Sequence, residues 1–300
     1  MENKQVGIIV LNYNCFEETI TFVKNIQSQR PSFPLKILIV DNNSSDNSYK
    51  EFAERFQNDV DVEFIKTKSN LGYGAGNNRG IKYLKDKYKL DYFIICNPDI
   101  KINIEHIPEI LKDFQIDEMI AAVSIQMLDV NNLKKISAWK LPDLKDDLIL
   151  SISILNKVFP SKMYYPNSSK SRYVEVLQGA FFIIKSEAME NIGGYDEKVF
   201  LYGEERILGF KLKKAGYKLY FDPRFTFTHK VGASIEKEFP LKSSKFIIMQ
   251  QSRRHYHKNY LNQNWIKLII FDFFSFIGKL EKVIFDFLNK ITFPKIFHTK

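Results

Sequence analysis

The sequence contains little cysteine: Cys15 and Cys96 are the only two among 300 residues, each beside an apolar run. Two cysteines exclude a disulfide scaffold and a metal site built on several thiolates, so we expect reduced, buried side chains. No charge-free apolar stretch reaches the roughly 18–20 residues that a membrane-spanning helix needs. The apolar run Val6–Leu11 is too short for a signal peptide, so the sequence predicts a cytoplasmic protein.

The sequence also lacks internal repeats and low-complexity tracts, and its 45% hydrophobic and 26% charged residues are ordinary globular usage. Its charge is unevenly distributed. Residues 1–240 carry 33 Lys and Arg against 32 Asp and Glu, whereas residues 241–300 carry 11 against 3. The net charge of +9 therefore lies almost wholly in the last 60 residues, which also hold 9 of the 26 Phe. We predict two regions, 1–240 and 241–300.

Short apolar runs alternate with helical patterns along the first hundred residues. The predicted strands are Val6–Leu11, Lys36–Val40, Val62–Lys66 and Tyr92–Cys96. The predicted helices between them are Phe16–Gln29, Asp46–Phe56 and Ala75–Tyr88. This order is typical of an α/β fold with a mostly parallel central sheet and helices on both faces.

The second half is less regular. Residues 129–172 have weak periodicity and are predicted to form a long excursion. Further strands are predicted at Ala121–Leu128, at Val174–Lys185 with Gly179 interrupting it, and at Tyr217–Asp222 before Pro223. A helix is predicted at Glu204–Ala215.

Small polar residues follow each of the first four predicted strands. They are Asn12–Asn14, Asp41–Asp46, Asn70–Gly74 and Asn97–Asp99. Such residues also make turns and helix N-caps. Four such loops at the carboxyl edge of one sheet nevertheless favour a ligand site, because ligands of α/β sheets bind there. The glycine-rich stretch Gly72–Gly80 opens a helix as a nucleotide-cradling turn would, without a dinucleotide or Walker pattern.

Three further features carry acidic or imidazole groups. Asp99 at a strand end suits a divalent cation held mainly by phosphate oxygens. Glu204 and Glu205 open a predicted helix, where they either complement the helix dipole or include a general base. His229 follows the last predicted strand and is either structural or a ligand of a metal or phosphate.

Seven segments occur together in a fixed order: VGIIVLNYN, LIVDNNSSDNS, NLGYGAGNNRG, CNPD, GAFFIIK, GGYDEKVFLYGEE and FTHKVGAS. In this order and spacing the chain resembles family 2 glycosyltransferases over residues 5–235, and most of all the rhamnosyltransferase-like bacterial group. The resemblance implies a GT-A fold in region 1–240. It also implies an inverting enzyme that moves a sugar from a UDP- or dTDP-sugar donor to a hydroxyl of a lipid-linked or growing surface glycan, with Mg²⁺ or Mn²⁺ as cofactor.

The resemblance assigns roles to the residues at matching positions. The expected nucleotide-binding residues are Asn12, Asn14, Asp41, Asn43, Asn70, Gly72, Asn77 and Asn97. The expected contacts to donor or acceptor sugar are Gly179, Ala180 and Asp196, and the expected metal ligands are Asp99 and His229. The expected catalytic residues are Glu205, at the family's base position, and Glu204 beside it.

Two departures from the family pattern bear on catalysis. The base position holds Glu205 where the family has Asp, one methylene shorter. Arg206-Ile207 replaces an apolar-Asp pair, and an Arg beside the base would lower the pKa of that base. The alternative function is therefore a catalytically degenerate protein that binds a nucleotide sugar or serves as a scaffold.

The basic region 241–300 also predicts amphipathic helices. Trp265–Ile277 is mostly apolar, and Leu280–Ile291 places apolar residues at helical spacing before Pro294 ends the pattern. Three interpretations stay open: helices packed on the catalytic region, a homodimer contact, or an interfacial anchor on the anionic inner face of the cell membrane. A nucleic-acid partner is disfavoured, because the basic residues are interleaved with long aliphatic and aromatic runs.

Overall fold

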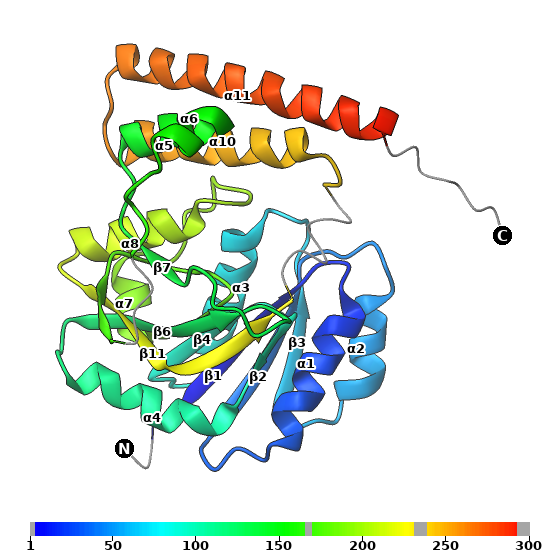
Figure 1. Ribbon diagram of the computed structural model, residues 1–300. Coiled ribbons are helices and arrows are strands. Elements are labelled where there is room, and N and C mark those ends of the chain that lie inside the picture. Colours follow the sequence, from blue (N-terminus) through cyan, green and yellow to red (C-terminus); the bar gives the residue numbers. More distant parts are fainter. Residues whose placement is uncertain (1–3, 166–169, 231–238, 293–300) are drawn as a thin grey trace. The chain divides into compact units, whose positions relative to one another are not determined.

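Figure 1 shows the computed structural model of the chain, which describes residues 4–165, 170–230 and 239–292. Its contacts divide the chain into two compact units. Unit 1 comprises Met1–Leu141, Tyr164–Phe200 and Glu204–Ser234. Unit 2 comprises Pro142–Met163, Leu201–Gly203 and Ile235–Lys300. The long excursion predicted after residue 129 is thus shared between the units, with Pro142–Met163 belonging to unit 2.

Unit 1 is built around a nine-stranded sheet. Its strands are β1 (Val6–Asn12), β2 (Leu35–Asp41), β3 (Val62–Lys66), β4 (Tyr92–Cys96), β5 (Ile100–Ile102), β6 (Ile120–Leu128), β8 (Arg172–Val174), β10 (Phe181–Lys185) and β11 (Lys218–His229). A second, two-stranded sheet pairs β7 (Ala138–Trp139) with β9 (Val176–Leu177). The single strand predicted at Val174–Lys185 is therefore divided among β8, β9 and β10.

The helices of unit 1 are α1 (Phe16–Ser28), α2 (Ser48–Phe56), α3 (Tyr73–Lys87), α4 (Ile107–Leu111), α7 (Ser186–Asn191) and α8 (Glu204–Lys214), with short 3₁₀ turns η1 (Ile104–His106) and η2 (Lys112–Gln115). The predicted helices of the first hundred residues are confirmed within two residues at each end.

The sheet combines a parallel half and a mixed half. Its strand order is β3-β2-β1-β4-β10-β6-β11-β5, with β8 also paired to β11. Strands β3, β2, β1 and β4 are parallel, whereas β10 is antiparallel to both β4 and β6. The chain leaves β1 toward β2 first and returns on the other side as β4, so a topological switch point lies between β1 and β4.

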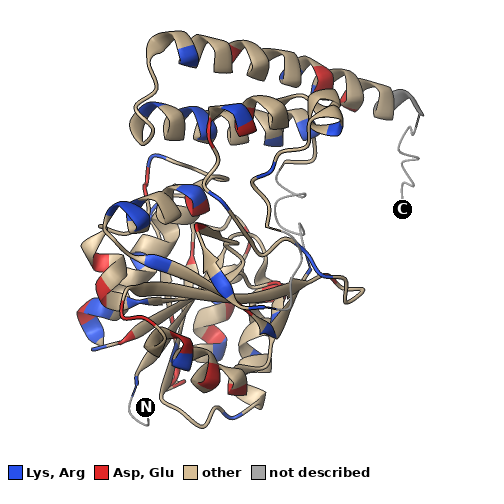
Figure 2. Ribbon diagram, turned by 60° about the vertical axis from the view of Figure 1, so that its left-hand side comes forward, with Lys and Arg blue, Asp and Glu red and all other residues tan. Residues whose placement is uncertain are grey.

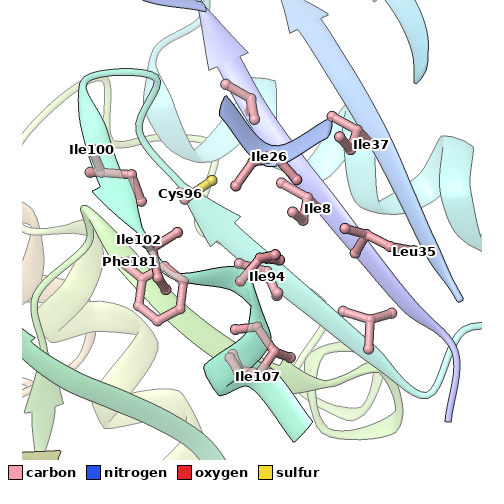
Figure 3. Close-up of a cluster of buried hydrophobic side chains, with 14 of the residues drawn as sticks. Ile8, Ile26, Leu35, Ile37, Ile94, Cys96, Ile100, Ile102, Ile107 and Phe181 are labelled. Atoms are coloured by element: carbon pink, nitrogen blue, oxygen red, sulfur yellow. The ribbon is translucent and has the colours of Figure 1, made fainter. Parts of the chain in front are cut away.

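Alternate residues of the central strands supply two hydrophobic clusters, one on each face of the sheet. Ile8 of β1 packs in a cluster with Ile26 of α1 and Ile107 of α4 (Figure 3). Its neighbour Ile9 points to the other cluster, which includes Leu84 of α3. Both faces of the strand are therefore buried, which explains why the strands are continuous apolar runs and confirms the predicted helices on both faces.

The last strand is longer than the sequence predicts. An end at Asp222 is wrong, because β11 continues past Pro223 to His229 along β6, with a register shift between Asp222 and Thr226. An irregularity of this kind tolerates proline, because the residues that it leaves unpaired need no ladder hydrogen bond. The extension pairs His229 with Ile100 of β5.

Buried charges surround this irregularity. Arg224 places Nη2 at 2.9 Å from Oδ1 of Asp113 and at 2.8 Å from Oδ2 of Asp222, and both carboxyl groups are at most 2% exposed. Burial, together with the neighbouring Asp222, raises the pKa of Asp113 to about 7. Burial acts on Asp222 as well, but hydrogen bonds from Arg224 outweigh it and hold the pKa of Asp222 below its ordinary value.

Unit 2 is helical. Its described helices are α5 (Leu144–Ser151), α6 (Ser153–Val158), α10 (Lys242–Asn259) and α11 (Trp265–Thr292). The two apolar stretches predicted after residue 264 form the single helix α11, since Gly278 between them stays helical. That glycine allows a close approach: a Cβ there would lie 2.1 Å from the backbone oxygen of Ser151 in α5. The predicted stop at Pro294 lies outside the described residues. None of the described helices is both long and apolar enough to cross a membrane.

The raised pKa of Asp113 predicts a pH-dependent stability. The folded chain binds this proton more tightly than the unfolded chain does, so this group lowers the free energy of unfolding as pH rises from about 4 to about 7. Asp113→Asn removes the titration and keeps an oxygen for Arg224. Urea unfolding at several pH values should show the variant gaining on the wild type across this range and exceeding it at about pH 8. Parallel pH profiles for the two proteins would contradict the prediction.

Candidate active site

The ends of β1 and β2 are joined by a buried polar network. Asn12 donates from Nδ2 to Oδ1 of Asp41 at 2.9 Å and to the hydroxyl of Ser44 at 3.0 Å, while its Oδ1 accepts from Thr19 at 2.8 Å. Asn12 and Asp41 have no exposed surface. The parallel register makes this possible, because it pairs the two residues directly. They hold the loops after both strands in place, and their predicted contacts to a nucleotide stay predictions.

Two asparagines of the same loops lie nearer the surface. Asn14 is half-buried with φ +52°, and its side-chain oxygen accepts a hydrogen bond from the amide of Ser45 at 2.9 Å. Asn43 is exposed with φ +62°. Asparagine adopts this left-handed conformation more readily than most residues, which explains its use at both turns.

The glycine-rich turn before α3 is fixed by side-chain amides. Oδ1 of Asn70 accepts from the amide of Gly72 at 3.0 Å and from Nδ2 of Asn42 at 2.8 Å. Gly72 has φ +94°, and a Cβ there would lie 2.0 Å from the backbone oxygen of Phe200. That oxygen accepts the amide of Tyr73 at 2.9 Å, so the backbone at 200 closes against the turn. Only glycine fits this position.

The first turns of α3 carry two further asparagines. Asn77 is fully buried, and its Oδ1 has no hydrogen-bond partner among the described residues. Asn78 accepts from the amide of Tyr195 at 2.9 Å and donates to its carbonyl at 3.0 Å, which ties the loop containing Asp196 to α3. Asp196 is half-buried, and its carboxylate accepts the amide of Lys198 at 2.9 Å.

The two predicted metal ligands lie together. Nε2 of His229 is 3.1 Å from Oδ1 of Asp99, and Nδ2 of Asn97 is 3.5 Å from the same ring nitrogen. The pairing of β11 with β5 brings these residues together across 130 positions of sequence. Nδ1 of His229 is buried and has no hydrogen-bond partner within the described residues. In that part of the chain no three His, Cys, Asp or Glu side chains form a metal-binding group, so a cation here would need oxygens from a ligand.

The carboxylate predicted as the base lies against a glycine. A Cβ on Gly179 would be 3.1 Å from Oε1 of Glu205, so the absence of a side chain makes room for this acid. The carbonyl of Gly179 accepts a hydrogen bond from the hydroxyl of Tyr73 at 2.8 Å. The next residue, Ala180, accepts the amide of Asn97 at 3.0 Å. The backbone at Gly179 and Ala180 therefore contacts the glycine-rich turn, Glu205 and the residues after β4.

Glu204 and Glu205 are adjacent but differ in environment. Glu204 is 9% exposed, and its Oε2 has no hydrogen-bond partner in the described structure. Burial, followed by repulsion from Glu205, raises the pKa of Glu204 well above its usual range. Arg206 lowers it by less than burial raises it. Burial therefore favours the protonated form of Glu204, whereas Glu205 is only half-buried and faces the Gly179 backbone.

Tyr73 and Asn42 belong to the site but were not predicted from the sequence. Tyr73 stacks edge-on against Tyr195, with 5.9 Å between ring centroids, and bonds to the carbonyl of Gly179. Asn42 donates to Asn70 and to the carbonyl of Gly72 at 3.1 Å. One sequence feature could have indicated a role for Tyr73: it is the one aromatic residue of the glycine-rich stretch. Nothing in the sequence indicated its partner 106 residues away.

The chain is similar in sequence to known proteins. The family model described as Glycosyl transferase family 2 matches residues 7–192. A low-salt glycan biosynthesis hexosyltransferase of Haloferax volcanii is 30% identical over 200 residues, which are 67% of this chain and 59% of that protein. An N-acetylglucosaminyl-diphospho-decaprenol L-rhamnosyltransferase of Mycobacterium tuberculosis is 26% identical over 209 residues, 65% of this chain and 66% of that protein. The chain spans 59% and 66% of the lengths of these two relatives.

Among solved structures, the mannosyltransferase PcManGT of Pyrobaculum calidifontis, in complex with GDP-Man and Mn²⁺, is similar in fold. It has a TM-score of 0.56 at 16% identity, and the match covers 87% of this chain and 65% of that one. At this identity the likeness concerns the fold alone. It confirms the GT-A architecture that the sequence predicted.

The turn at Gly72 predicts a marked difference between two glycines with positive φ. Gly193, at φ +68°, has no atom within 4 Å of the position that a Cβ would take, so Gly193→Ala should lower the free energy of unfolding by about 1–2 kcal/mol through backbone strain alone. Gly72→Ala adds a clash with the backbone of Phe200 and should cost about 3 kcal/mol or more. Urea unfolding measures both, and equal losses would contradict the close approach.

Proposed function

This chain belongs to glycosyl transferase family 2, in its rhamnosyltransferase-like group, and we propose that it transfers a sugar from a nucleotide diphosphate donor to a hydroxyl of a growing glycan. One observation carries the proposal: contacts run from the turn at Gly72 through Tyr73 and Gly179 to Glu205. A glycine-rich turn that opens a helix suits a diphosphate, and a carboxylate joined to it suits removal of a proton.

Glu205 is the proposed general base. An alcohol is a weak nucleophile until its proton is removed, and Glu205 accepts this proton as the acceptor oxygen bonds to the anomeric carbon of the donor sugar. The bond from that carbon to the diphosphate oxygen breaks at the same time, and its electron pair leaves with the diphosphate. Attack on the face opposite the leaving group inverts the anomeric configuration.

The residues after β4 fit a divalent cation, Mg²⁺ or Mn²⁺, as the cofactor. Asp99 offers a carboxylate oxygen, His229 a ring nitrogen 3.1 Å away, and the two converge in a buried place. We assign these two residues as the protein's ligands, with diphosphate oxygens completing the set. When bound, the cation would neutralise negative charge on the diphosphate.

The proposed donor is a UDP- or dTDP-sugar. Its pyrimidine and ribose would lie along the loops after β1, β2 and β3, which contain Asn14, Asn43 and Asn70. The hydrogen bond between Asn12 and Asp41 holds the first two of these loops in place. Gly179 and Ala180, between Glu205 and Asn97, would lie beside the transferred sugar.

The proposed acceptor is a lipid-linked or growing surface glycan. The name of the mycobacterial relative describes an acceptor on decaprenyl diphosphate, a lipid carrier. An enzyme that acts on such a carrier must reach the membrane surface, so we propose a cytoplasmic protein bound peripherally at the inner face of the cell membrane.

A second candidate function is nucleotide-sugar binding without catalysis. It is favoured by Arg206-Ile207, which depart from the pattern of active relatives and are both buried beside the acidic pair. Binding and turnover, measured separately, distinguish the two functions.

Glu205→Gln keeps the shape of the side chain and removes its ability to accept a proton. Transfer or donor hydrolysis should therefore fall by about 10²-fold or more, while the melting temperature shift with nucleotide sugar stays that of the wild type. Glu187→Gln on α7, an exposed acid, is the matched control and should keep full turnover. Full activity of Glu205→Gln would move the base to Glu204 or Asp196, and loss of activity in Asp196→Asn would then select Asp196. No turnover by the wild type, despite donor binding, would favour the second function.

Asp99→Asn tests the cation site without relying on turnover. Thermal shifts with a panel of nucleotide sugars should be larger with Mn²⁺ or Mg²⁺ than with EDTA in the wild type, because a ligand that binds only the folded state raises its stability. Asp99→Asn should lose most of this cation-dependent part. Asp61→Asn, an exposed aspartate, is the control and should retain it. A cation-dependent shift that survives in Asp99→Asn would contradict the assignment.

A further inference from the structure

Helix α11 exposes a continuous apolar face. Twelve of its large hydrophobic side chains are at least 41% exposed, and eleven of them, from Trp265 to Leu288 without Phe285, make up what we call the apolar face. Ile266, Ile269, Phe273, Leu280, Ile284 and Phe287 follow one another at intervals of three, four or seven residues, which places them on one side of the helix. Scattered surface hydrophobics need no explanation, but a stripe of this length indicates a partner.

The folding of unit 2 uses the other side of α11. Leu268 and Phe271 are at most 8% exposed, and the ring of Phe271 lies 5.2 Å from that of His257 in α10. Asp286 accepts the amide of Ser243 at the start of α10 at 2.9 Å. These contacts hold α11 on α10, and Gly278 packs against Ser151 of α5. The apolar face takes no part in them and is exposed in the described structure.

The charge of unit 2 is basic mainly because of α10, which has five Lys and Arg and no acid. Along α11 from 265 to 288 the three lysines are balanced by Asp272, Glu281 and Asp286, and none of these charged residues falls within the apolar face. Lys267 and Lys279 are exposed and lie toward the two margins of that face by helical spacing. Figure 2 marks the charged positions of α10 and α11. Residues 241–300 carry a net charge of +8. A second copy would bring two such basic regions together, whereas an anionic bilayer offers the opposite charge.

The length and the charge pattern of α11 indicate how this helix would bind a membrane. At 28 residues α11 is about 42 Å long, but Lys, Asp and Glu recur along its other side, and no described helix meets the requirements of a span. A helix with one apolar, aromatic-rich side and a charged opposite side lies along the interface instead. Trp265, 70% exposed at the start of α11, suits the headgroup level.

We infer that α11 lies flat in the interface of an anionic phospholipid bilayer, with its apolar face among the acyl chains and Lys267 and Lys279 at the headgroups. The inference rests on the proposed function in one respect only: the lipid-linked acceptor gives the protein a reason to bind a membrane. The contact itself follows from the exposed residues of α11.

Vesicle flotation of the full chain tests this inference. The wild type should float with phosphatidylcholine vesicles that contain phosphatidylglycerol, and much less with phosphatidylcholine alone. The double variant Phe273→Glu with Phe287→Glu changes two side chains that are about 60% exposed, so it should fold normally. Its vesicle-bound fraction should fall roughly tenfold or more. Lys267→Gln with Lys279→Gln should weaken the preference for anionic vesicles.

The matched control places the same charges elsewhere. Val60→Glu with Leu133→Glu alters exposed apolar residues of unit 1, 79% and 59% exposed, and should float as the wild type does. A wild type that stays in the soluble fraction with both kinds of vesicle overturns the inference. So does a lipid-free dimer in light scattering that the α11 double variant converts to a monomer, since a second copy would then occupy the face.

Failure of this inference is distinguishable from failure of the proposed function. The Glu205→Gln chain should float as the wild type does, because the base plays no part in lipid contact. Conversely, the Phe273→Glu, Phe287→Glu chain should keep its thermal shift with nucleotide sugar. Lipid binding and donor binding are thus lost by different variants.

Discussion

The pairing of strand β4 is the constraint on which the site in unit 1 depends. It runs parallel to β1 and antiparallel to β10, so β4 ends at the edge of the sheet where β10 begins. One edge therefore receives Asn97 and Asp99 after β4, and Gly179 and Ala180 before β10. A parallel β10 would have begun at the opposite edge, and the glycine beside Glu205 would have been a strand length away.

The two glutamates that open α8 are adjacent in sequence but differ in burial. Glu204 is enclosed near Tyr73 and Tyr195, and burial raises the pKa of all three groups well above their ordinary values. Glu205 keeps access and rests on backbone without a side chain. Residues 1–240 are nearly neutral in charge, so the proposed recognition of a nucleotide sugar there would rest on amides, backbone turns and a cation rather than on a basic surface.

The fold of the first hundred residues could be predicted because its signals are local. Central strands are buried on both faces, so they are continuous apolar runs such as Ile8–Val10, and polar residues must follow where they end. Signals that depend on distant partners failed. Pro223 predicted the end of a strand. However, β11 continues beyond Pro223, because it pairs with β6 and because Arg224 forms ion pairs with Asp113 and Asp222. Likewise, α11 is one continuous helix in which Gly278 packs against α5, and no local sequence pattern indicates this contact.

For the site, the sequence by itself determined which residue types stand at the strand ends: asparagines and glycines after β1 to β3, Asp99 after β4, and an acidic pair at the start of α8. It also determined that the basic charge and the apolar stripe share one segment. Only the tertiary structure decided which of these groups meet. His229 reaches Asp99 through strand pairing, Tyr73 reaches the carbonyl of Gly179, and burial raises the pKa of Glu204 beside the less buried Glu205. The physical reason is that hydrogen bonding and desolvation depend on neighbours brought together by folding, whereas residue type and periodicity are properties of the chain alone.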